Sequence, residues 1–136
     1  NTSPPTLTPP PTATQPVATG TVVGTGVQIV HIFYDGLQDP NEPDEYIEIK
    51  NFENTPVDLT DWWIYAEINS QFFPFTEFSL GPGQSCRVYT NLIEADSCVS
   101  DSFLSIFEVW ENSGDCGYLY DAENEERSVF CYGETP

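Results

Sequence analysis

A run of acidic residues between positions 35 and 45 holds the side chains best suited to chemistry in this sequence. Proteins bind calcium through about six to eight oxygen atoms, and a loop with this many carboxylates supplies about four or five of them. The run does not follow the known calcium-loop pattern, because Pro43 and Asp44 stand where that pattern needs Asn or Asp and then Gly. Two interpretations stay open: a solvated loop without a cation, or a calcium site formed by Asp35, Asp39, Asn41, Glu42 and Asp44, with Glu45 ending the run.

Residues for other kinds of catalysis are sparse. Nucleophilic catalysis needs Ser or Cys beside a base, usually His, and the single histidine, His31, lies in an apolar run where a strand residue is expected. The sequence contains no GxSxG, phosphate-loop or HExxH motif. A carboxylate pair for glycoside hydrolysis is the remaining alternative, since its separation is set in three dimensions. We expect that the chain is not an enzyme and needs no cofactor unless calcium binds.

The four cysteines are expected to form disulfides. Their spacing contains no CxxC, and one histidine cannot complete a usual zinc set. Several pairings are possible. A predicted hairpin brings Cys116 opposite Cys131, and the loop after the strand that begins at Cys86 carries Cys98 back, so we favour Cys116–Cys131 and Cys86–Cys98. Disulfides indicate an oxidising compartment, here extracellular or at the cell surface.

The charge of the chain limits its partners. The sequence has 22 acidic residues, 3 Lys and Arg and a formal net charge of -19. Phosphate backbones and anionic membrane surfaces repel such a protein, so we expect no nucleic acid and no membrane as partner. No apolar run reaches the roughly 18 residues of a membrane span. A divalent cation or a basic partner is the kind of ligand that this charge attracts.

The composition divides the chain into three parts. Residues 1–26 are rich in Pro and Thr and contain no charged or aromatic residue, which predicts a disordered linker. Residues 27–133 form the expected folded domain, and residues 134–136 are a short C-terminal tail. The sequence opens on Asn without a visible signal peptide, so we interpret it as a processed piece of a larger exported protein.

The folded part is predicted to be all-β. In 45–51 apolar and polar residues alternate, so Ile47 and Ile49 should face inward. Trp62 and Trp63 are consecutive, so one should lie in the core and the other should be an exposed anchor for a sugar ring or a partner protein. Short strands with turns between them indicate a β-sandwich. The expected strands are 27–34, 45–51, 62–68, 71–75, 86–90, 103–110, 116–121 and 127–132.

Five segments, in this order, resemble the lamin tail domain family. They are "YDG" (34–36), "DEYIEIKN" (44–51), "VDLTDWWI" (57–64), "LGPGQSCRVYT" (80–90) and "WENSGDCGYLYD" (110–121). The resemblance covers 27–132 and implies an immunoglobulin-like β-sandwich of seven to nine strands. The chain lacks the heptads of a filament rod. It therefore looks like the bacterial exported versions of the domain, which implies an interaction or tethering role, and no nuclear partner is carried over.

These observations lead to one functional hypothesis and one alternative. We expect a monomeric, non-catalytic, extracellular interaction or tethering module of a larger secreted protein, which binds a protein or glycan at the cell surface through Trp62 or Trp63. The alternative is a calcium-dependent ligand-binding domain that uses the acidic loop 35–45.

Overall fold

The computed structural model describes residues 26–134. The predicted linker 1–26 lies outside this range except for Gly26, and the predicted tail 134–136 lies outside it except for Glu134. The described residues form nine strands and no helix, as expected for an immunoglobulin-like β-sandwich. None of them belongs to a helix long and apolar enough to cross a membrane.

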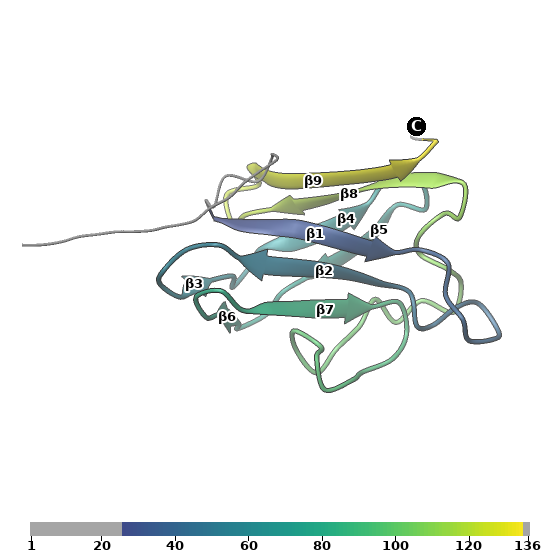
Figure 1. Cartoon of the computed structure of the whole chain (residues 1–136), viewed down its shortest axis with the longest axis horizontal. Coiled ribbons are helices and arrows are strands. Elements are labelled where there is room, and N and C mark those ends of the chain that lie inside the picture. Colours follow the sequence, from purple (N-terminus) through teal and green to yellow (C-terminus); the bar gives the residue numbers. More distant parts are fainter. Residues whose placement is uncertain (1–25, 135–136) are drawn as a thin grey trace, which may run out of the picture.

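Two antiparallel sheets face each other as the layers of the sandwich (Figure 1). One sheet has the order β1-β2-β7 and the other β5-β4-β8-β9, while β3 and β6 form a separate pair. The strands are β1 (Val27–Phe33), β2 (Tyr46–Asn51), β3 (Val57–Asp58), β4 (Trp63–Ala66), β5 (Gln71–Pro74), β6 (Ser79–Leu80), β7 (Ser85–Tyr89), β8 (Gly114–Tyr120) and β9 (Glu126–Gly133).

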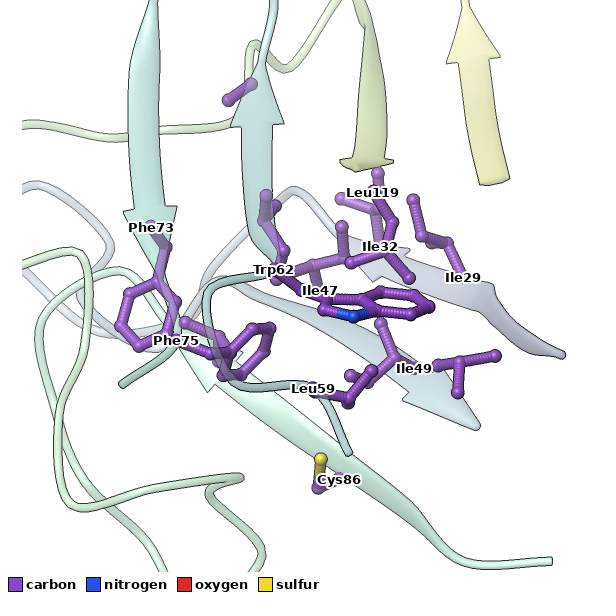
Figure 2. Packing of buried hydrophobic residues seen from close by; sticks show 14 of the residues in the cluster. Ile29, Ile32, Ile47, Ile49, Leu59, Trp62, Phe73, Phe75, Cys86 and Leu119 are labelled. Atoms are coloured by element: carbon purple, nitrogen blue, oxygen red, sulfur yellow. The ribbon is translucent and has the colours of Figure 1, made fainter. Parts of the chain in front are cut away.

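The core lies between the inner faces of the two sheets. Ile47 and Ile49 of β2 are fully buried, which confirms the inward face predicted from the alternation. Trp62 is also buried, and Figure 2 shows its indole among isoleucines of β1 and β2 and Leu59. Gly117 of β8 has no side chain because space is short here: a Cβ would lie 2.9 Å from Ile32 and 3.0 Å from the Trp110 ring.

The prediction of a strand over 103–110 is wrong. Leu104 has a φ of 57°, in the left-handed region that a strand does not use. The amides of Val109 and Trp110 donate to the carboxylate of Glu45 instead of to a neighbouring strand. The segment is an irregular loop whose end inserts Trp110, with no exposed surface, into the core.

The edges of both sheets are protected. At the free edge of β7, the amide of Arg87 donates to Asp96 O at 2.9 Å and the amide of Cys98 donates to Arg87 O at 2.7 Å. The disulfide Cys86–Cys98 joins the same two segments. At the edge strand β5, Pro74 has no amide hydrogen to offer. Such edges do not pair readily with strands of other chains.

The second disulfide, Cys116–Cys131, joins directly opposite residues of β8 and β9. Both disulfides therefore have the pairing favoured from the sequence. Each closes a short stretch of chain, with sequence separations of 12 and 15 residues. In the chain-entropy model, loops of this length stabilise a domain by about 3 kcal/mol each.

Asn51, at the end of β2, connects three parts of the sandwich. Its buried amide nitrogen lies 2.9 Å from Thr55 O, 3.0 Å from Leu80 O and 3.1 Å from Gly81 O. Its Oδ1 accepts from the amide of Glu53 at 2.8 Å. One side chain thus links the end of β2 to the turn that follows it and to the end of β6 and the turn after β6.

Asn51→Asp is expected to lower the free energy of unfolding by at least about 3 kcal/mol, because a buried carboxylate without a proton to donate would face three carbonyls, one of them buried and two part-buried. Urea denaturation measures the loss. Asn91→Asp, at an exposed position, is the matched control and should change stability by no more than about 0.5 kcal/mol. Equal stabilities of the two variants would contradict a structural role for the Asn51 amide.

Candidate functional site

Aromatic side chains cover the outer face of the sheet β5-β4-β8-β9. Trp63 and Tyr65 alternate with the buried Ile64 and Ala66 on β4, so they point away from the core. The neighbouring strands add rings in register, since Tyr65 lies opposite Phe72 of β5 and Tyr118 of β8, and Trp63 lies opposite Tyr120 of β8. We call this set the aromatic face: Trp63, Tyr65, Phe72, Tyr118 and Tyr120.

The rings of the aromatic face stack on one another. The Trp63 ring stacks on Tyr120 with centroids 4.3 Å apart and planes 14° apart. Its centroid also lies 5.7 Å from that of Phe72, and the Phe72 ring lies 5.0 Å from Tyr65. The Trp63 Nε1 donates to Asn124 Oδ1 at 2.9 Å. Because its neighbours and its own hydrogen bond hold Trp63 in place, the aromatic face is a rigid surface.

Exposure differs across the aromatic face. Phe72 is 58% exposed, whereas Trp63, Tyr65, Tyr118 and Tyr120 are half-buried against each other. Of the two predicted anchors, Trp62 is therefore a core residue and Trp63 is the outward one, as expected for consecutive strand residues. Phe72 was not among the residues predicted for a site, although it lies two positions before Pro74 on the same edge strand.

Carboxylates border the aromatic face. The Tyr118 hydroxyl donates to Glu67 Oε1 at 2.7 Å, and this hydrogen bond to a carboxylate raises the pKa of Tyr118 to about 12. Burial raises the pKa of Tyr120, and the charge of Glu126 raises it further and also acts in the same direction on Tyr118. Both tyrosines therefore stay neutral at physiological pH, and the face is apolar with a negative rim.

The structure disperses the predicted calcium ligands. Asp35, Asp39 and Asn41 are exposed. Asp44 accepts from the amides of Leu37 and Gln38 at 2.8 and 3.0 Å, so its oxygens close the loop. Among the residues that the structure describes, the carboxylates close enough to share a cation are Glu42, Glu45 and Glu108, so only Glu42 of the five predicted ligands belongs to this group.

Glu45 is the buried member of this group. Its Oε1 accepts from Thr90 Oγ1 at 2.8 Å and from the amides of Val109 and Trp110 at 2.8 and 3.3 Å. Its Oε2 is buried without a hydrogen-bond partner. Removal from water raises the pKa of Glu45 to about 8, although the three hydrogen bonds oppose this shift. This burial could not be predicted from the sequence, because Glu45 adjoins an acidic loop.

Glu108 lies in the field of Glu42. Burial raises the pKa of Glu108, and the neighbouring Glu42 carboxylate raises it further, followed by Glu111 and Asp35. Carboxylates this close cannot all be charged at low cost unless a proton or a cation lies between them.

A surface hollow of about 410 Å³ lies beside Arg87, on the sheet β1-β2-β7. The Arg87 guanidinium is bonded to Glu48 at 3.1 Å and to Asp96 at 3.2 Å, and it lies 4.0 Å from the centre of the Tyr46 ring. The Tyr89 hydroxyl donates to Asp96 at 2.7 Å. Since these polar groups bind each other, the hollow does not present a base poised beside a nucleophile.

The raised pKa of Glu45 makes stability depend on pH. The folded protein holds the Glu45 proton more tightly than the unfolded chain, so stability is full below the unfolded pKa and is lost as pH rises through the folded pKa, between about pH 5 and pH 8. Glu45→Gln keeps an acceptor for its three donors and cannot ionise. Its free energy of unfolding should fall less than that of wild type over this range, measured by urea denaturation in metal-free buffer. Parallel pH profiles would contradict the raised pKa.

The sequence matches the model of a known protein family. The model of the Lamin Tail Domain family matches residues 23–134, which include all nine strands. A search of curated proteins finds no match.

Proposed function

The chain belongs to the lamin tail domain family, an immunoglobulin-like family of binding and structural domains that is not known for catalysis, and on that basis we propose that it is an interaction module of a larger exported protein. The aromatic face is the proposed contact surface. Two disulfides, with no membrane-spanning helix among residues 26–134, are compatible with an extracellular location. We propose the cell surface as the location of the module and tethering as its role.

The exposed Phe72 beside a fixed Trp63 is the observation that carries the proposal. Large rigid aromatic side chains supply contact area at little cost in conformational entropy, and such residues dominate the energy of many interfaces. A face that is already ordered by its own stacking loses little freedom when a partner covers it.

The geometry favours a protein over a glycan as partner. A sugar ring packs on an open aromatic face, but Tyr120 covers one face of the Trp63 ring and Phe72 leans toward the same indole. The part of the Trp63 indole that stays accessible suits contact with side chains of a protein surface. The carboxylates Glu67 and Glu126 near this surface, together with a net charge of -19, favour a partner with Lys or Arg residues and disfavour a second copy of the chain.

A peptide of alternating Lys and Leu is a suitable probe, titrated into the isotope-labelled chain and followed by NMR. We expect it to shift the indole signal of Trp63. Phe72→Ala should weaken its binding at least about tenfold, as for an interface anchor, whereas Leu37→Ala, which shortens a side chain that is 84% exposed on a distant loop, should not.

Two further probes make the result specific. A Lys-Ser peptide of the same charge should bind more weakly, because it lacks the apolar Leu side chains that contact the aromatic face. The net charge of the chain attracts both peptides equally. Cellohexaose and chitohexaose should leave the Trp63 signal unchanged, and a shift with either sugar would indicate a glycan partner instead. Equal peptide affinities of Phe72→Ala and wild type would refute the aromatic face as the binding surface.

A further inference from the structure

The loop end of the sandwich carries a second cluster, formed by residues other than those of the aromatic face. One carboxylate oxygen of each of Glu42, Glu45 and Glu108 lies within 4.8 Å of the other two. Glu42 and Glu45 belong to the loop between β1 and β2, and Glu108 belongs to the loop before β8. Residues more than 60 positions apart are thus held together by the fold.

No basic side chain of the described residues neutralises this cluster. Arg87 is bonded to Glu48 and Asp96, and Arg127 is bonded to Asp121 at 3.0 Å. Lys50 lies over the ring of Phe52, near the opposite end of β2. The three cations of the sequence are therefore all engaged elsewhere.

Glu45 supplies an independent observation that points to a ligand at this cluster. Its side chain is fully buried, and Oε1 already accepts from Thr90, Val109 and Trp110. Its Oε2 has no partner, although a buried carboxylate oxygen without one costs free energy. Oε2 is the oxygen that Glu45 has left to offer to a ligand shared with Glu42 and Glu108.

We propose that Glu42, Glu45 and Glu108 bind one calcium ion, which links the loop between β1 and β2 to the loop before β8. Calcium accepts carboxylate oxygens in mono- or bidentate form and completes its shell with carbonyls and water, so three carboxylates at an accessible loop end suit it. Glu42 and Glu108 are partly exposed, which gives the ion a path to the buried oxygen.

Calcium binding would also order an apolar surface. The loop that contains Glu108 carries Leu104, Ile106 and Phe107, each about two-thirds exposed. An ion held by Glu108 would add a link between this loop and the loop before β2, next to the hydrogen bonds that Glu45 already makes to Val109 and Trp110.

The test uses the full chain and calcium alone. Thermal unfolding with calcium at about 100 times its dissociation constant should occur several degrees higher than in EDTA. Terbium should replace calcium and emit when tryptophan is excited, since the amide of Trp110 lies 3.3 Å from Glu45 Oε1. Calcium should displace the terbium signal.

Substitutions assign the site. Glu108→Gln and Glu42→Gln should each weaken calcium binding at least about tenfold through loss of ligand charge. Glu123→Gln makes the same change of charge on the exposed turn before β9 and should alter it less than about twofold. Asp39→Asn, in the predicted acidic loop, should behave like Glu123→Gln.

Three results would overturn the proposal. They are identical unfolding of wild type in calcium and EDTA, wild-type affinity in Glu108→Gln, and loss of binding in Asp39→Asn but not in Glu108→Gln. The first result would mean that a shared proton, and not a calcium ion, allows the three carboxylates to lie close together. None of these results bears on the aromatic face, because Phe72, whose substitution tests that face, is not one of the three calcium ligands.

Discussion

A single buried carboxylate determines how one end of this sandwich closes. Glu45 stands just before β2 and holds the amides of Val109 and Trp110. These hydrogen bonds fix the end of the irregular segment 103–110 and place the Trp110 indole in the core. A glycine at position 117 leaves room for the indole there. The cost is the burial of an acidic group: removal from water raises the pKa of Glu45 to about 8, and its three hydrogen bonds offset this shift only in part.

The two layers of the domain have different tasks. The sheet β1-β2-β7 supplies four of the buried isoleucines, Ile29, Ile32, Ile47 and Ile49, and its exposed edge is closed by the segment that Cys98 anchors to Cys86. The sheet β5-β4-β8-β9 buries one face in the same core and leaves rings on the other. A strand with large residues on both faces serves folding and recognition at once, so the stability of the aromatic face is tied to that of the core.

The sequence was informative where one strand face is buried and the other is not. The alternation in 45–51 allowed the inward residues to be predicted, because strand geometry has a period of two. The consecutive tryptophans allowed the prediction that one of them faces outward, and the structure shows that it is Trp63. It failed over 103–110, where β-forming residues such as Ile106 and Phe107 are exposed on a loop. Nothing local could reveal this, since the acceptor that draws the backbone away, Glu45, lies 64 positions before Val109.

The ends of the domain set how it would carry load in a longer chain. Figure 1 shows that β1 and β9 lie side by side and run in the same direction, so the chain enters at one end of the sandwich and leaves at the other. The amide of Ile29 donates to Ser128 Oγ across this contact. Tension applied through both termini would slide the two strands along each other, so many contacts would have to break together and not one after another. Stretching along this axis would therefore load the contact between β1 and β9 in shear.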